Sequence, residues 1–174
     1  MVYGKHEGNN KRLALDIASF LLSIKKTPTI VCIGSDKVIG DSLGVIVGES
    51  LKSKLSEKAY IYGDLSNPIT KNNLIETIKN IRDKHPDSPM IVIDSVLGYE
   101  EEIGCVKTHS NGVMIGGEFG EGLMVGDYSI LGVVACKGIS ALQFLGSVKL
   151  NTVVDLSNMI VDGVCRALKL CLAL

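Results

Sequence analysis

Three short runs of apolar, mostly β-branched residues constrain the fold of this chain more than any other feature. They are "TIVCIG" (residues 29–34), "AYIYG" (59–63) and "PMIVIDSVLG" (89–98). Their non-alternating composition is typical of strands that are buried on both faces of a parallel sheet. We therefore expect the strands at 29–33, 59–62 and 90–93 to lie in one parallel sheet.

Amphipathic segments with helical spacing separate these runs, and two further strand-like runs follow them. The expected helices are residues 9–26, 42–56, 69–85, 139–148 and 151–174. The further strands are expected in "IGCVKTHS" (103–110) and "DYSILGVVAC" (127–136), with the glycine-rich loop "NGVMIGGEFGEGLMVG" (111–126) between them. Such alternation predicts an α/β fold with three layers, in which helices cover both faces of a mainly parallel central sheet.

Length and charge narrow the function classes. The chain has 174 residues, of which 46% are hydrophobic, enough for one compact domain spanning residues 1–174. The 18 Lys and Arg residues nearly balance the 19 Asp and Glu residues, and no basic block interleaves with aromatic residues. The composition therefore argues against a nucleic-acid partner.

The ends of the chain and the cysteines indicate a cytoplasmic protein without a membrane partner. The N-terminal "MVYGKHEGNN" has no apolar signal-peptide core, and the apolar C-terminal run carries charged residues along one helical side. The five cysteines occur singly within apolar surroundings, so we expect buried thiols in a reducing compartment rather than disulfides or metal ligands.

The segment Gly40-Asp41-Ser42-Leu43 opens one class of serine esterases, and it raises the question whether Ser42 is a nucleophile. Those enzymes need a histidine, usually three residues after an aspartate. None of the three histidines of this chain has that spacing, and a serine without a base is an unactivated alcohol. We expect Ser42 to lie in the first turn of the following helix and to satisfy free backbone N–H groups there.

Asp41 and Asp94 form a better pair of candidates. Asp41 opens the helix after the first buried strand, and Asp94 ends the strand "PMIVID". Ligands in parallel α/β sheets bind beyond the carboxyl ends of the strands, so the two carboxyl groups would face each other if these strands are neighbours. The pair could then serve as acid and base around a water, or hold a divalent cation. Asp is also a common helix N-cap, and Asp94-Ser95 could simply form a turn.

Four segments in sequence order carry a resemblance to a known family. They are "IGSDKVIGDSLGVIVGESL" (33–51), "YIYGDLSNPITKNNL" (60–74), "IVIDSVLG" (91–98) and "VGDYSILGVV" (125–134). From about residue 29 onward the chain resembles the YyaC family of sporulation proteins, which are described as spore proteases. That family is similar to the germination protease of spore formers and, more remotely, to the hydrogenase maturation proteases, which share a three-layer α/β/α fold.

The resemblance assigns roles to particular residues. In the germination protease the catalytic aspartates lie in Pro-Asp-Ala-Leu-Gly and Ile-Asp-Ala segments, which correspond here to residues 40–44 and 93–95. It therefore implies that Asp41 and Asp94 are catalytic. The maturation enzymes hold nickel at the corresponding positions with the help of a loop histidine, but the loop 111–126 contains none, and His109 lies just upstream. A metal, if the protein holds one, would bind Asp41 and Asp94; no other cofactor is expected.

The resulting hypothesis is an aspartate-dependent endopeptidase that acts on a specific protein during sporulation or spore germination, in the spore or forespore. Its partner would be a protein or peptide substrate. We expect the substrate to contact residues at the strand ends and in the glycine-rich loop, namely Gly34, Ser42, Ser95, Gly116 and Gly117. The glycines could supply backbone N–H groups to an anion or only flexibility.

The alternative is a non-catalytic sporulation protein with the same fold that binds a peptide or metal. A nucleoside phosphorylase-like enzyme has less support, because no aromatic residue for purine stacking lies near either aspartate.

Overall fold

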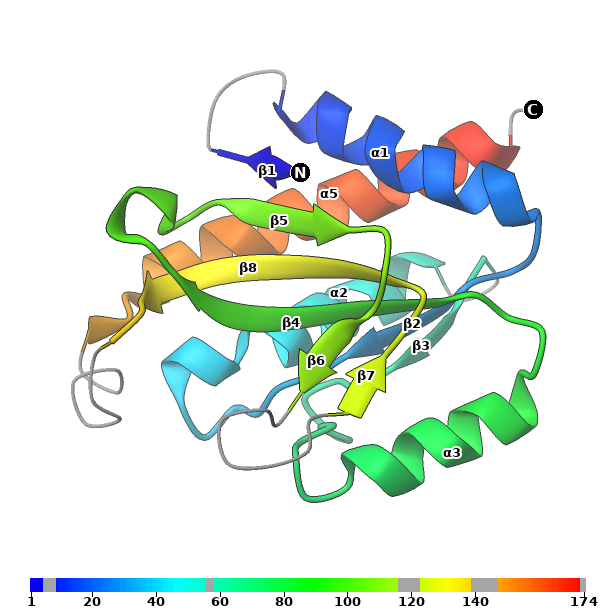
Figure 1. The fold of residues 1–174 in the computed structure, drawn as a ribbon, viewed down its shortest axis with the longest axis horizontal. Coiled ribbons are helices and arrows are strands. Elements are labelled where there is room, and N and C mark those ends of the chain that lie inside the picture. The colour runs from blue at the N-terminus through cyan, green and yellow to red at the C-terminus, as the bar shows by residue number, and fades with distance from the viewer. Residues whose placement is uncertain (5–8, 56–57, 116–122, 139–146, 173–174) are drawn as a thin grey trace.

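The computed structural model describes residues 1–4, 9–55, 58–115, 123–138 and 147–172, and a six-stranded sheet forms its centre (Figure 1). The sheet order is β1-β5-β8-β4-β2-β3. Its strands are β1 (Val2–Tyr3), β2 (Thr29–Cys32), β3 (Tyr60–Tyr62), β4 (Met90–Gly98), β5 (Val106–His109) and β8 (Tyr128–Cys136). Strands β3, β2, β4 and β8 are parallel to one another. Strand β5 pairs antiparallel with β8, and β1 pairs antiparallel with β5. The predicted parallel sheet through the three apolar runs is confirmed.

Helices cover both faces of this sheet, which confirms the predicted three-layer α/β/α arrangement. Helices α1 (Asn9–Ile24), α2 (Leu43–Leu55) and α5 (Leu150–Leu172) pack on one face, and α3 (Leu74–Lys84) packs on the other (Figure 1). The alternation of side chains along β4 explains why both cores are apolar. Ile91 and Ile93 belong to the core under α1, α2 and α5, whereas Val92 belongs to the core under α3.

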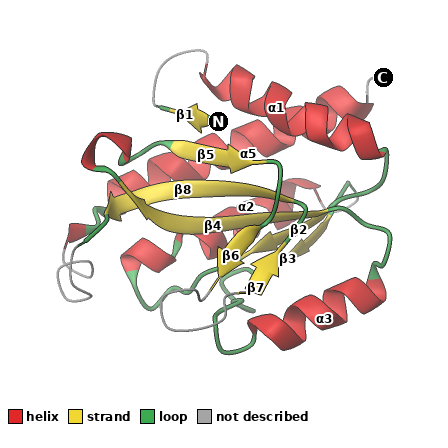
Figure 2. Ribbon diagram, viewed as in Figure 1, coloured by secondary structure: helices red, strands yellow, loops and turns green. Residues whose placement is uncertain are grey.

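Several local predictions differ from the structure. A two-stranded hairpin of β6 (Val113–Ile115) and β7 (Leu123–Val125) stands in front of the sheet, within the stretch predicted as a loop (Figure 2). The short β1 was not predicted either, because two residues carry no periodicity. The third helix begins at Leu74 rather than at residue 69, because the Asn73 side chain accepts a hydrogen bond from the Thr70 N–H over 2.8 Å and closes a turn there. Most of the helix predicted at 139–148 lies outside the described residues.

Two further expectations concern the cysteines and the longer helices. All five cysteines are free; Cys32 is fully buried, but the other four are only half-buried, which corrects the expectation of buried thiols. Among the described helices, none combines the length and apolar character that a membrane-spanning segment needs.

The carboxylate of Asp16 links α1 to the part of the sheet formed by β1, β5 and β8. One oxygen of Asp16 accepts hydrogen bonds from the hydroxyls of Tyr3 at 3.0 Å, Thr108 at 2.6 Å and Tyr128 at 2.7 Å. Burial alone would raise the pKa of Asp16, but the three hydroxyl donors outweigh burial and hold the pKa below its usual value. The ionised carboxylate therefore stabilises the contact of α1 with β1, β5 and β8.

Replacing Asp16 by Asn should lower the free energy of unfolding by about 3 kcal/mol at pH 7, because buried hydroxyls lose a charged acceptor. The contribution of Asp16 is present above the unfolded-state pKa of about 3.9 and is lost as the pH falls through the lower folded-state pKa. Urea unfolding of both proteins should therefore give a difference that shrinks below about pH 4. Asp36→Asn, at an exposed position, is the control and should behave like the wild type. A difference that does not change with pH would contradict this role.

Candidate active site

The chain closes tightly on itself between the end of β2 and the start of α2. The Ser35 N–H donates to the Asp41 carbonyl over 3.0 Å, so the 3-10 turn η1 (Ile39–Asp41) folds back over the strand end. Gly34 has φ +151°, and a Cβ atom there would lie 2.1 Å from the Asp41 carbonyl oxygen. Only glycine allows this approach, and it places Asp41 at the carboxyl end of β2.

Asp94 lies inside β4 rather than at its end, which corrects the sequence prediction. The reason is that β4 continues to pair with β8 as far as Gly98, whereas its pairing with β2 stops at Cys32 and Ile93. Asp94 is therefore the first residue of β4 beyond its pairing with β2. Because η1 contacts β4, the turn that carries Asp41 lies against this part of the strand.

The charge of Asp41 acts on the carboxyl group of Asp94. Burial raises the pKa of Asp94 to about 7, the Ser95 N–H that donates to its carboxylate over 2.7 Å offsets part of this effect, and the charge of Asp41 raises the pKa further. Burial also raises the pKa of Asp41, and the backbone N–H of Ser35 lowers it in part. Near neutral pH, Asp94 thus exchanges its proton readily near a second carboxyl group, and two such groups can serve as an acid and base pair.

Ser42 lies directly before α2, and its hydroxyl has a structural partner. The Oγ atom donates to the Ile39 carbonyl over 2.7 Å, and the Ser42 carbonyl accepts the Ile46 N–H as the first hydrogen bond of the helix. The expected bond from the Ser42 side chain to the free N–H groups of α2 is therefore replaced by a bond to η1. Of the histidines that the structure describes, His85 bonds to the Tyr62 hydroxyl and His109 lies in β5, so neither is hydrogen-bonded to Ser42.

The other residues predicted to contact the substrate are Gly34, Ser95, Gly116 and Gly117, and the two that the structure describes, Gly34 and Ser95, differ in burial and in hydrogen bonding. Gly34 is buried, and its N–H donates to the Ile69 carbonyl over 2.8 Å. Ser95 is half-buried next to Asp94, and its N–H is the donor to that carboxylate. Gly116 and Gly117 lie outside the described residues. Ser42 and Ser95 are the sequence neighbours of the two aspartates, and the backbone N–H groups of Gly34 and Ser95 already donate to acceptors within the protein.

The described residues do not complete a metal site around the two aspartates. No group of three or more His, Cys, Asp or Glu side chains suited to a metal ion occurs among them. His109 pairs with Ser129 in β8, whereas Asp94 pairs with Leu131, so β8 separates His109 from β4 by two strand spacings, roughly 9–10 Å. Because hard divalent cations take about six oxygen ligands, the two carboxylates alone are a poor fit for such an ion.

One buried charge at the same sheet edge was missed. Asp64 follows β3 and is 2% exposed; it forms an ion pair with Lys52 of α2 and accepts the N–H groups of Ser66 and Asn67 at 2.8 and 2.7 Å. The segment "GDLSN" does signal a turn that an Asp side chain closes. Its pairing with Lys52 depends on how α2 packs, which no local pattern reveals. Asp64 stabilises the loop after β3 that borders the site.

Together, these features define an α/β protein with a pair of aspartates at the point where β4 extends beyond its pairing with β2. The chain belongs to the family described as "Protein of unknown function (DUF1256)", which matches residues 1–163. It is also 32% identical over 139 residues to "Uncharacterized protein YyaC" of Bacillus subtilis (strain 168), a match that covers 79% of this chain and 68% of that protein. The resemblance to the YyaC family is thereby confirmed.

One solved structure with a similar backbone is that of the [NiFe] hydrogenase maturation protease HycI from Thermococcus kodakarensis KOD1. The two sequences are 18% identical, the TM-score is 0.49, and the similarity covers 83% of this chain and 97% of that protein.

Replacing Asp94 by Asn should make the protein more stable at alkaline pH. The raised folded-state pKa means that the folded protein holds a proton which the unfolded chain releases, so the stabilisation contributed by the Asp94 proton is fully present below about pH 4 and is lost as the pH rises through about 7. Relative to the variant, the wild type should lose on the order of 3 kcal/mol between pH 4 and pH 8. Urea unfolding across this range measures the difference, with Asp36→Asn as the exposed control. Parallel pH profiles for wild type and Asp94→Asn would contradict the raised pKa of the Asp94 carboxyl group.

A fluorophosphonate probe should leave Ser42 unlabelled, because its hydroxyl donates to a backbone carbonyl and bonds to neither described histidine. Mass spectrometry of the intact and digested protein would detect the adduct, with a known serine esterase as the positive control. Stoichiometric labelling at Ser42 would instead identify it as a nucleophile.

Proposed function

We propose that this protein is an aspartate-dependent endopeptidase in which Asp41 and Asp94 activate a water molecule between them. The observation that supports the proposal is the placement of two carboxyl groups at the carboxyl end of β2, where β4 continues beyond its pairing with β2 and the charge of Asp41 raises the pKa of Asp94. The peptide substrate and the role in sporulation or germination rest on the resemblance of residues 40–44 and 93–95 to the germination protease.

The different environments of the two aspartates suggest their roles. Asp94 has a pKa of about 7, raised by burial and by the charge of Asp41, so it holds its proton more firmly and is the acid. Asp41 is the base. Asp41 takes a proton from water as the oxygen attacks the scissile carbonyl carbon, and Asp94 gives its proton to the carbonyl oxygen. When the tetrahedral intermediate collapses, the C–N bond breaks, Asp41 passes its proton to the leaving nitrogen, and Asp94 recovers one from the hydroxyl. No covalent intermediate forms.

Asp41→Asn should remove most peptidase activity, Asp94→Asn should do the same, and the double variant should lose little more, because members of one catalytic unit are strongly non-additive. Each single change should lower the rate by about 100-fold or more, the range of general acid–base catalysis. The measurement is cleavage of a library of spore-derived peptides, read by mass spectrometry. Activity should also fall above about pH 7, as Asp94 loses its proton.

The matched control is Asp36→Asn, an exposed aspartate in the same loop as Asp41, which should keep full activity. Unfolding midpoints of all variants separate loss of catalysis from loss of fold. If wild type and variants bind a peptide equally but none cleaves it, the protein is the non-catalytic binding protein of the alternative hypothesis. Full activity in both single variants would refute the aspartate mechanism.

A further inference from the structure

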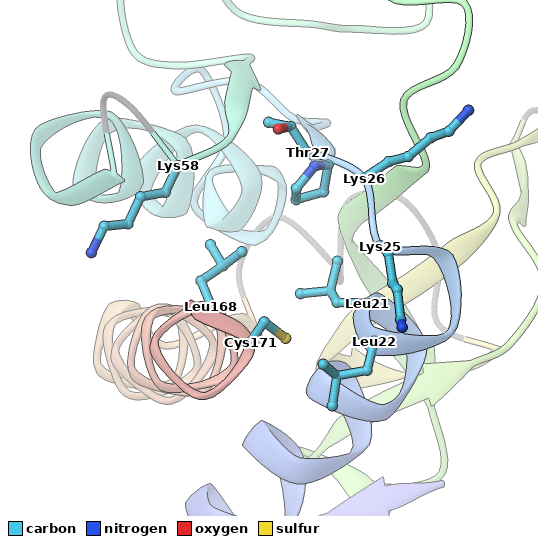
Figure 3. Close-up of a pocket in the computed structure, with 9 residues that line it drawn as sticks. Leu21, Leu22, Lys25, Lys26, Thr27, Lys58, Leu168 and Cys171 are labelled. Carbon is cyan, nitrogen blue, oxygen red and sulfur yellow. The ribbon is translucent and has the colours of Figure 1, made fainter. Parts of the chain in front are cut away.

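A hollow of about 500 Å³ opens between the last turns of α1 and α5, at the end of β2 opposite to the two aspartates. Its floor is apolar and consists of Leu21 and Leu22 of α1, Leu168 and Cys171 of α5, and Pro28. Figure 3 shows Leu21 and Leu168 facing each other across the gap, with Cys171 beside them. The volume falls within the range of small-molecule sites, and such sites are mostly lined by apolar side chains.

The charged residues that the structure describes around this hollow all have the same sign. They are Lys25, Lys26 and Lys58, and no acidic residue occurs among the described lining residues. Lys26 forms an exposed ion pair with Asp87 at 3.4 Å, and in Figure 3 its side chain points away from the apolar floor. Among the described residues, Lys25 and Lys58 have no such partner, and Figure 3 places them on opposite sides of the floor. Two cations without an ion-pair partner in the described part of the chain thus border an apolar hollow.

The backbone at Lys25 supplies a separate observation. Lys25 ends α1 with its N–H donating to the Leu21 carbonyl over 3.0 Å, and its φ of 54° is the only positive value among the described non-glycine residues. This left-handed position after a helix is where glycine is preferred, because a Cβ atom is strained there. A lysine at this position makes the fold less stable than a glycine would, but it places a cation at the rim of the hollow. This combination points to a function for the Lys25 side chain.

We infer that this hollow binds an amphiphile, whose acyl chain lies against Leu21, Leu22 and Leu168 and whose anionic head group is held by the field of Lys25 and Lys58. The volume favours a small molecule over a helix of another protein, and the charges select a carboxylate or phosphate head group. The site is distinct from the proposed active site, because it lies at the amino end of β2 whereas Asp41 and Asp94 lie at its carboxyl end.

The test is calorimetric titration of the full chain with dodecanoate and with dodecyl phosphate, each below its micelle concentration. We expect one molecule to bind per chain, whereas dodecanol and dodecylammonium should bind much more weakly. Stronger binding of dodecanoate would identify a fatty acid as the natural class, and stronger binding of dodecyl phosphate a phospholipid-like head group. The bound ligand should also slow alkylation of Cys171 and leave that of Cys105, which is outside the hollow, unchanged.

The decisive variant is Lys25→Gly, because the two roles of the residue predict opposite results. Glycine relieves the left-handed backbone, so the unfolding midpoint should not fall, whereas dodecanoate affinity should fall about threefold. Lys58→Gln should have a similar effect on affinity, and the double variant should lose roughly tenfold. Lys26→Gln is the matched control, since its ammonium is already paired, and it should bind like the wild type.

Equal binding of dodecanoate, dodecanol and dodecylammonium would overturn the proposal, as would unchanged affinity in the folded double variant. Binding only to anionic vesicles, with no response to monomeric dodecanoate or dodecyl phosphate, would indicate a membrane surface and would also overturn it. Peptide cleavage by the wild type and by Lys25→Gly is measured in parallel, so failure of this site and failure of the proposed peptidase are distinguishable.

Discussion

The site depends on the close approach of two backbone segments, the end of β2 at Ile33 and Gly34 and the segment from Asp41 to Gly44. No side chain fits between them, because the contacting residues are glycines. A Cβ atom at Gly34 would lie 2.1 Å from the Asp41 carbonyl oxygen, and one at Gly44 would lie 1.9 Å from the Ile33 carbonyl oxygen. These contacts bring the start of α2 directly onto the end of β2. Asp41 is thereby placed beside β4, and Asp94 becomes its neighbour although 52 residues separate them in the sequence.

Asp16 and Asp94 illustrate how the same side chain takes opposite properties in one fold. Both are half-buried, but Asp16 accepts three hydroxyl donors, whereas the described partner of Asp94 is a single backbone N–H. Donors favour the ionised form and burial disfavours it, so the pKa of Asp16 is lowered and that of Asp94 is raised to about 7. Asp16 stabilises the fold, whereas Asp94 weakens it at neutral pH. A residue that weakens the fold and lies beside a second carboxyl group is a good candidate for a functional role.

The layers and the parallel strands could be predicted because their signals are local. Runs such as "TIVCIG" are apolar at every position, and the helical segments repeat apolar residues at helical spacing. The hairpin of β6 and β7 was missed because glycines and exposed side chains such as Met114 and Met124 hide its pattern. The length of β4 was underestimated because Asp94 and Ser95 look like a strand end. Pairing with β8 carries the strand past them.

By itself, the sequence determined the strands of the parallel sheet and most of the helices, and it singled out Asp41 and Asp94 as candidates, because residue type and periodicity are properties of neighbours in the chain. Only the tertiary structure decided that β4 continues past the end of β2, that Ser42 bonds to Ile39, and that Lys25 and Lys58 border one hollow. Strand register, helix packing and burial depend on contacts between residues far apart in the sequence. The pKa of Asp94 depends on the same contacts, because it is set by what covers the carboxyl group and not by its flanking residues.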